Sequence, residues 1–163
     1  MSATTKPGCL GFLFGFGRKE KNQTQFPYIA KQYFFSNAEA SFYHFLKQML
    51  GDSAIIFPHV ALRDLVGLQK GLDNSSRSTY YNKIDRKQVD FLLVDSKNLK
   101  PLLVIELDDS SHQEQDRVQR DEFVEKVLAT VKIPIARIPV KQSYNAKELT
   151  ELFQQKIQLN NKN

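Results

Sequence analysis

Acidic residues and a histidine follow one another closely at the end of an apolar run. The run Pro101–Leu107 is rich in Leu, Val and Ile, yet Glu106 lies inside it, and Asp108, Asp109 and His112 follow. An ionised carboxylate that is removed from water costs several kcal/mol unless it is paired or binds a metal. Glu106 therefore needs a partner inside the fold.

A second apolar run, Gln88–Val94, also contains one acidic residue, Asp90. If residues 88–94 and 102–108 form a hairpin, Asp90 lies opposite Glu106, and directly opposed residues have Cβ atoms about 5 Å apart. Asp108 follows Glu106 by two residues and so points from the same face of the strand. The pattern predicts that three carboxylates converge at one edge of a sheet.

Three converging carboxylates repel one another unless a cation lies between them. A ligand set made only of oxygen atoms suits a hard cation such as Mg²⁺ or Mn²⁺. The alternative is that Asp90 and Glu106 form ion pairs with basic residues, for instance Arg120 or Lys126. His112 has two interpretations as well, as a base in the site or as a capping histidine where a strand turns into a helix.

Four short segments resemble the motifs of the PD-(D/E)xK, restriction-endonuclease-like superfamily. They are Val89-Asp90-Phe91, Val104-Ile105-Glu106-Leu107-Asp108, Ser111-His112 and Arg120-Asp121. Within it, the chain resembles a bacterial group called domain of unknown function 2726, with kinship to very-short-patch-repair endonucleases. The resemblance runs from about residue 33 to residue 152. It implies an αβββαβ core and a metal-dependent phosphodiesterase in which Asp90, Glu106 and residue 108 hold the metal.

The third motif position departs from the superfamily pattern, because Asp108 stands where a lysine is usual. A working enzyme could use Asp108 as a further metal ligand and His112 as the base. A lapsed enzyme could instead bind metal and DNA without cutting. The resemblance also implies a secondary role near the metal for Glu39, which could instead be a capping-box residue alone. Arg120 lies on the helical side of Val124 and Val127 and could neutralise a carboxylate, bind a phosphate or form a structural ion pair.

The spacing of apolar residues predicts the helices and strands that position these residues. Ser36 and Glu39 form a capping box before an apolar helical stripe, and Gly51 is a natural stop. We expect strands at 54–57 and 59–66 (or one strand bent at Pro58), 88–94, 101–107 and 133–138, and further helices at 114–131 and 146–157. The order αββββαβα predicts an α/β fold with a mixed α+β sheet, three layers and an extra C-terminal helix.

Residues 69–87 lack an apolar period and read as a long functional or disordered loop. The loop combines cations with two tyrosines, a composition that could follow a nucleic-acid backbone and stack a base. The alternative is an ordinary solvated face. The residues expected to contact nucleic acid are Lys70, Arg77, Tyr80, Tyr81, Lys83, Arg86 and Lys87.

Length and charge suit one cytoplasmic domain with an anionic partner. The 163 residues carry a net charge of +5, and Cys9 as the one cysteine excludes an internal disulfide. We expect a flexible tail at 1–25, a nuclease-like domain at 26–158 and a disordered tail at 159–163. The apolar segment 9–17 is too short to span a bilayer and is either a tail or a weak interfacial anchor that gives membrane association.

These observations predict a metal-dependent nuclease that hydrolyses phosphodiester bonds of nucleic acid, DNA rather than RNA. The alternative is an inactive nuclease-fold module that binds nucleic acid or protein.

Overall fold

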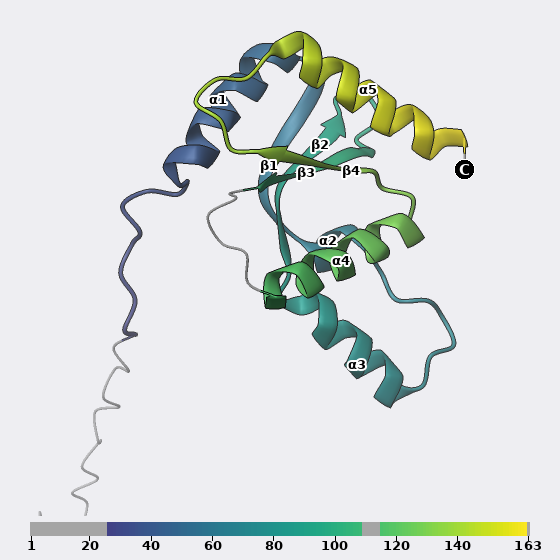
Figure 1. The fold of residues 1–163 in the computed structure, drawn as a ribbon. Helices are drawn as coiled ribbons and strands as arrows, with labels where there is room; N and C mark the ends of the chain where they lie inside the picture. The colour runs from purple at the N-terminus through teal and green to yellow at the C-terminus, as the bar shows by residue number, and fades with distance from the viewer. Residues whose placement is uncertain (1–25, 109–114, 163) are drawn as a thin grey trace, which may run out of the picture. The chain divides into compact units, whose positions relative to one another are not determined.

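The structure is a computed structural model that describes residues 26–108 and 115–162, without the side chains of 115–121, 161 and 162. The chain divides into two units, Met1–Gln32 and Tyr33–Asn163, and every helix and strand among the described residues lies in the second. The predicted anchor at 9–17 and the predicted base His112 lie outside the described residues. Figure 1 shows the second unit as a sheet between two layers of helices.

Four strands form one mixed sheet in the order β1-β2-β3-β4. Strand β1 (Ala54–Ala61) pairs antiparallel with β2 (Gln88–Asp95), and β2 pairs antiparallel with β3 (Pro101–Asp108). Strand β4 (Ile135–Pro139) lies parallel to β3. The predicted mixed sheet is confirmed, and β1 is one strand that continues through Pro58.

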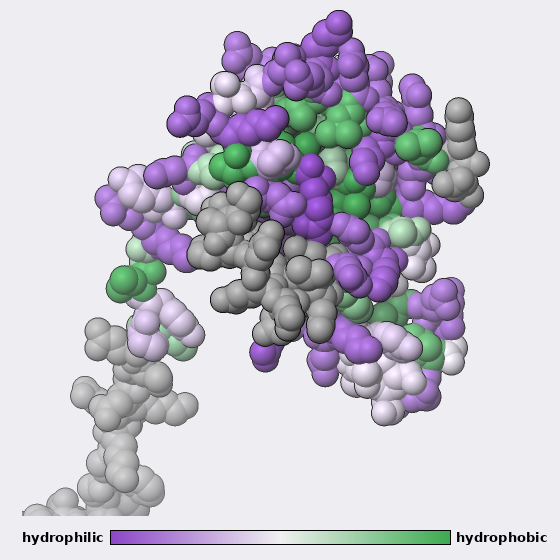
Figure 2. Space-filling view, viewed as in Figure 1, coloured by the Kyte–Doolittle hydropathy of each residue, from purple (hydrophilic) through white to green (hydrophobic). Residues whose placement is uncertain are grey.

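Helices cover both faces of this sheet. Helices α1 (Asn37–Leu50) and α5 (Ala146–Lys162) lie on one face, and α2 (Leu62–Leu65), α3 (Asn74–Asp85) and α4 (Gln115–Thr130) lie on the other (Figure 1). Each layer buries its own apolar cluster against the central strands. Hydrophilic side chains cover the outer sides of the helices, and apolar ones gather between the layers (Figure 2).

The caps of α1 form as the sequence predicts. The Ser36 hydroxyl accepts a hydrogen bond from the Glu39 backbone N–H at 3.2 Å, and Glu39 Oε2 accepts one from the Ser36 N–H at 2.7 Å. Gly51 ends the helix with a φ of 52°, a left-handed conformation that glycine adopts without strain. The apolar stripe of α1 buries Phe42 and Leu46 completely against the sheet.

Three predictions of secondary structure are wrong. Residues 62–65 form the helical turn α2 rather than strand, and the predicted loop at 69–87 contains the twelve-residue helix α3. Asp73 caps α3 by accepting a hydrogen bond from the Ser76 N–H, and the helix buries only Ile84, so it shows no apolar stripe in the sequence. The tail expected to be disordered from 159 belongs to α5, where the Asn160 amide donates to the Lys132 carbonyl.

Candidate functional site

The register of β2 and β3 brings the two buried acids together. Phe91 pairs with Ile105 and Leu92 with Val104, and one further step along both strands sets Asp90 opposite Glu106. The ladder is regular here, because its one irregularity falls between Leu93 and Val94 at the other end of the strands. The predicted pairing is confirmed.

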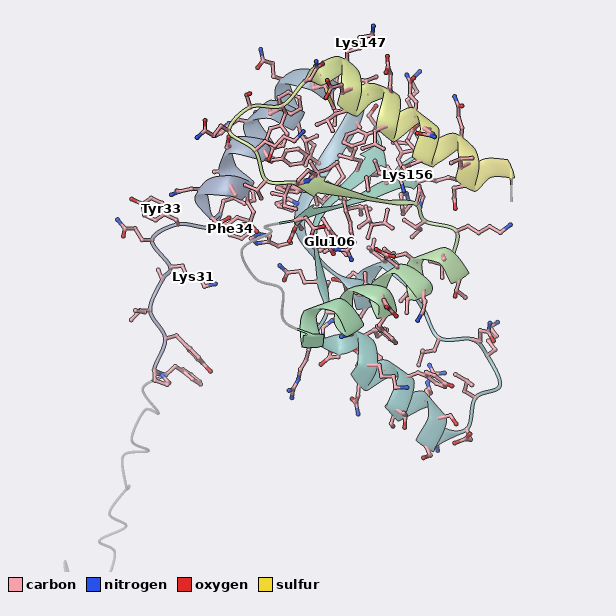
Figure 3. All side chains as sticks on the ribbon, viewed as in Figure 1. Lys31, Tyr33, Phe34, Glu106, Lys147 and Lys156 are labelled. Carbon is pink, nitrogen blue, oxygen red and sulfur yellow. The ribbon has the colours of Figure 1, made fainter. Side chains whose placement is uncertain are left out.

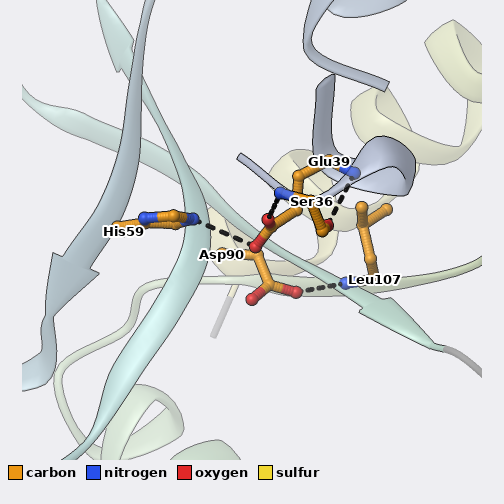
Figure 4. Close-up of polar contacts among 5 residues, drawn as sticks. All are labelled: Ser36, Glu39, His59, Asp90 and Leu107. Atoms are coloured by element: carbon orange, nitrogen blue, oxygen red, sulfur yellow. Dashed lines mark hydrogen bonds and ion pairs between the residues drawn. The ribbon is translucent and has the colours of Figure 1, made fainter. Parts of the chain in front are cut away.

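Asp90 and Glu106 are cross-strand neighbours, and Glu106 is close enough to lower the pKa of Asp90. Asp90 Oδ2 also accepts a hydrogen bond from the backbone N–H of Leu107 at 2.7 Å (Figure 4). Burial raises the pKa of Asp90, and the nearby negative charge of Glu39 raises it further, against the lowering effect of the Leu107 N–H and of Glu106. Two neighbouring carboxylates repel each other when both are ionised, which favours a proton or a cation between them.

Glu39 and His59 form a second polar pair beside Asp90 (Figure 4). Glu39 Oε1 lies 3.0 Å from His59 Nε2. Burial raises the pKa of Glu39, but the Ser36 backbone and hydroxyl bonds and the His59 contact outweigh it, so the pKa is lowered overall. Glu39 therefore brings a negative charge to the site from α1, in the place where the resemblance implied a secondary residue.

Sequence reasoning missed His59. Its backbone has a φ of 53°, a left-handed conformation that is uncommon outside glycine. Its ring lies 4.8 Å from the ring of Phe34 and 5.5 Å from that of Phe35, measured between centroids. The β1–β2 pairing sets it opposite Asp90, since Pro58 pairs with Phe91 and Val60 with Val89. The one signal in the sequence is a histidine directly after a proline within an apolar strand.

Asp108 is directed toward a different partner. Its Oδ1 lies 3.7 Å from Arg137 Nη1, and the Nε–H of Arg137 donates to Glu125 Oε1 at 2.7 Å. Arg137 pairs with Glu106 in the β3–β4 register and ties the sheet to α4. Sequence reasoning missed Arg137 as well, although an arginine inside the apolar run 133–138 signals a buried partner as clearly as Glu106 does.

The described residues bring together two possible oxygen donors for a metal ion. Among residues 26–108 and the described side chains of 122–160, no group of three His, Cys, Asp or Glu is placed to hold a metal ion. Asp90 and Glu106 contribute two carboxyl groups from paired positions of neighbouring strands, and carboxylate oxygens are the donors that a hard cation takes. The donor chemistry fits Mg²⁺ or Mn²⁺, and a third carboxylate would come from Asp108 or Glu39.

The other expected partners of the acids are placed elsewhere or lie outside the description. Lys126 forms an ion pair with Glu122 one turn away on α4, at 3.0 Å, and not with Asp90 or Glu106. The side chain of Arg120 lies outside the described side chains.

The residues expected to contact nucleic acid lie on α3 and its flanks instead of on one loop. Tyr80 and Tyr81 are 49% and 46% exposed, and Lys83 Nζ lies 5.3 Å from the centre of the Tyr80 ring. Lys87 Nζ lies 5.2 Å from the centre of the Phe123 ring. The side chains of Lys70, Arg77 and Arg86 are exposed.

Residues 31–157 match a family described as protein of unknown function, DUF2726. The chain belongs to this family. The DUF2726 match extends from before α1 to near the end of α5, so it includes Glu39, His59, Asp90 and Glu106. No curated protein and no solved structure matches the chain. In the part of the chain that the structure describes, no helix is long and apolar enough to cross a membrane.

Proposed function

We propose that this DUF2726 domain is a metal-dependent nuclease with its centre at Asp90 and Glu106. The observation that supports the proposal best is the cross-strand pairing of these two acids, each from the interior of a strand. Proteins rarely keep two acids this close in a partly buried place without a cation or a chemical task. The PD-(D/E)xK resemblance assigns its metal ligands to the same two positions.

The residues at this centre would have separate roles. A bound Mg²⁺ or Mn²⁺ would act as a Lewis acid and lower the pKa of its water for attack on a phosphate. Asp90 and Glu106 would hold the cation, and the Leu107 N–H fixes the orientation of the Asp90 carboxylate. Glu39, held by Ser36 and His59, adds negative charge on the α1 side, which favours a cation at the site.

The lysine that is usual in the superfamily is absent, so in this proposal Asp108 is a further metal ligand and His112 is the base. Asp108 becomes a third ligand if its side chain turns from Arg137 toward Glu106, a change that breaks a contact of 3.7 Å. Exposed or half-exposed ion pairs of this length contribute about 1 kcal/mol or less, so the turn costs little. His112 would serve as the base, and the cationic residues on α3 and its flanks would contact nucleic acid, DNA rather than RNA.

A second candidate function is a DUF2726 module that binds nucleic acid or protein without cutting. The observation that favours it is the Asp108–Arg137 contact, because it leaves two carboxyl groups in place of three. The absence of the usual lysine at position 108 points the same way.

A cleavage assay separates the two functions. The purified full chain is incubated with mixed single- and double-stranded DNA and RNA in Mg²⁺, in Mn²⁺ and in chelator. The proposal predicts metal-dependent cleavage that Asp90→Asn and Glu106→Gln each abolish, while Glu151→Gln, on the exposed side of α5, leaves it unchanged. Absence of metal-dependent cleavage on every substrate, with the protein folded, would reject the nuclease.

A further inference from the structure

A hollow of about 500 Å³ lies between α2, α3 and the segment that joins them. Its volume is within the range of about 300–1,000 Å³ that small-molecule sites occupy. Polar and cationic groups face it from two helices, with the backbone of Gly67 at the rim. The residues whose chemistry suits a ligand are Arg63, Arg77, Ser78, Tyr81 and Asn82.

The two arginines that line the hollow differ in their ion pairing. Arg63 donates from Nη1 to Asp85 Oδ1, which positions its guanidinium group. Asp85 raises the pKa of Arg63. Arg63 and Tyr81 line the same hollow from α2 and α3. Arg77 forms no ion pair within the described part of the chain. Its planar group, with five donors, is therefore available for an anion.

Helical spacing brings the remaining groups to the same side. Arg77 and Tyr81 are four residues apart on α3, as are Ser78 and Asn82, and residues at this spacing are neighbours on a helix surface. The side of α3 that faces the hollow thus combines a guanidinium group, a half-exposed aromatic ring, a hydroxyl and an amide. Phosphate, base face and base edge are the three parts of a nucleotide that these groups recognise.

Tyr80, the neighbour of Tyr81, belongs to a different surface. It lines a second hollow whose other walls are mostly apolar, among them Leu72, Phe123 and Val127. The ammonium group of Lys83 lies near its ring. Two adjacent tyrosines of nearly equal exposure therefore have unequal surroundings, because arginines line the hollow of Tyr81 and not that of Tyr80.

The hollow lies at the same end of the sheet as the carboxyl pair. Helix α2 follows Ala61, which pairs with Gln88, and the Leu62 N–H donates to the Lys87 carbonyl at 2.8 Å. Asp90 is two residues farther along β2, roughly 7 Å at the rise of an antiparallel strand. A nucleic-acid strand held in the hollow would therefore lie at the end of the sheet that carries Asp90 and Glu106.

We propose that the hollow of Arg63, Arg77, Tyr81 and Asn82 binds one nucleotide of a single-stranded nucleic acid, with phosphate at the arginines and the base stacked on Tyr81. This site rests on the proposed function for its class of partner, nucleic acid, but it does not require that the protein cleaves that partner. Two of the seven residues expected to contact nucleic acid, Arg77 and Tyr81, belong to this site. Arg63 and Asn82 are its further members.

Fluorescence anisotropy of a labelled short single-stranded DNA, with chelator present and no divalent ion, tests the site. We expect Tyr81→Leu to weaken binding about tenfold, because base–aromatic stacking contributes about 1–3 kcal/mol. Tyr81→Phe should bind like the wild type, and Tyr80→Leu is the matched control that should bind almost normally. Equal losses from Tyr80→Leu and Tyr81→Leu would overturn the site.

The phosphate contact has its own test in the salt dependence of the same binding. Arg77→Gln should weaken binding and reduce the slope of log affinity against log salt by about 0.7, the value for one phosphate of a single strand. Lys156→Gln removes one charge from α5, in the other helix layer (Figure 3), and should leave the slope unchanged. Equal effects of the two substitutions would show a diffuse charge effect and overturn the site.

Three further outcomes separate this site from the alternative explanations. Adenosine monophosphate that competes as well as an unlabelled strand would make the hollow a site for free nucleotides and overturn the strand assignment. Binding that depends on Arg77 and Tyr81 in a protein that cleaves nothing would reject the nuclease and support the nucleotide site. A wild-type chain that binds no single-stranded DNA would overturn the nucleotide site itself, whatever the cleavage assay shows.

Discussion

Asp90 Oδ2 accepts a hydrogen bond of 2.7 Å from the backbone N–H of Leu107, one residue past its cross-strand partner Glu106. The bond ties the carboxylate to the neighbouring strand, so its position follows from the β2–β3 register and not from a flexible side chain. A slip of one residue would turn Glu106 to the opposite face of the sheet. The geometry of the candidate site is therefore determined by the same ladder that builds the core.

Asp90→Asn should stabilise the fold at neutral pH. The folded pKa of Asp90 lies above its ordinary value of 3.8, so this group contributes its full stability below pH 3.8 and loses it as the pH rises through the folded pKa. Asparagine has no charge to lose and can still accept from the Leu107 N–H. Urea unfolding between acid and neutral pH should show the free-energy difference, variant minus wild type, growing with pH.

Asp95→Asn is the control for this titration, because the pKa of Asp95 is shifted in the opposite direction to that of Asp90. The N–H groups of Asn98 and Lys97 lower the pKa of Asp95, so its contribution is present above pH 3.8 and is lost as the pH falls through the folded pKa. The Asp95→Asn variant should therefore be the less stable one at neutral pH and equal the wild type in acid. An Asp90→Asn difference that is independent of pH would contradict the raised pKa.

Ser36→Ala should lower the free energy of unfolding by about 1 kcal/mol, the usual contribution of a helix N-cap. The substitution removes the hydroxyl that accepts from the Glu39 N–H and loosens Glu39 beside Asp90. Ser75→Ala, near the start of α3, is the control and should change stability little. Thermal unfolding measures both, and equal effects would show that the Ser36 cap contributes nothing of its own.

Asp108→Lys distinguishes a working site from a lapsed one. In a working site the lysine removes a ligand and sets a cation against Arg137, which lies 3.7 Å from the present carboxylate. We expect cleavage to fall at least tenfold, and Asp108→Asn to fall by less because it keeps an oxygen donor. The measurement is the initial cleavage rate at saturating Mg²⁺. A rise in rate for Asp108→Lys would instead support the lapsed enzyme.

The sequence predicted the parts of the fold that follow a clear period. The capping box and apolar stripe of α1, and the apolar runs of β2 and β3 with one acid in each, led to the correct elements and the correct register. These features are local or depend on one hairpin. A single sequence is enough to read them.

The sequence did not predict what depends on contacts between distant segments. Helix α3 buries little more than Ile84 and therefore has no apolar stripe to detect. His59 and Arg137 reach the site through β1 and β4, strands whose neighbours in the sheet cannot be read from their own residues. The ion pair of Arg137 also explains why Asp108 does not join Asp90 and Glu106, a detail that the alternation of the strand alone could not show.

Calorimetric titration of the full chain with Mn²⁺, in two buffers that differ in ionisation enthalpy, tests the metal site directly. We expect one ion to bind at the Asp90–Glu106 pair. Binding should release a proton when the titration begins from the protonated pair, because a cation replaces the proton between the two carboxyl groups. Asp90→Asn should abolish this binding, and Glu151→Gln should preserve it. A chain that binds no Mn²⁺, or an Asp90→Asn variant that binds as tightly as the wild type, would contradict a metal site at this pair.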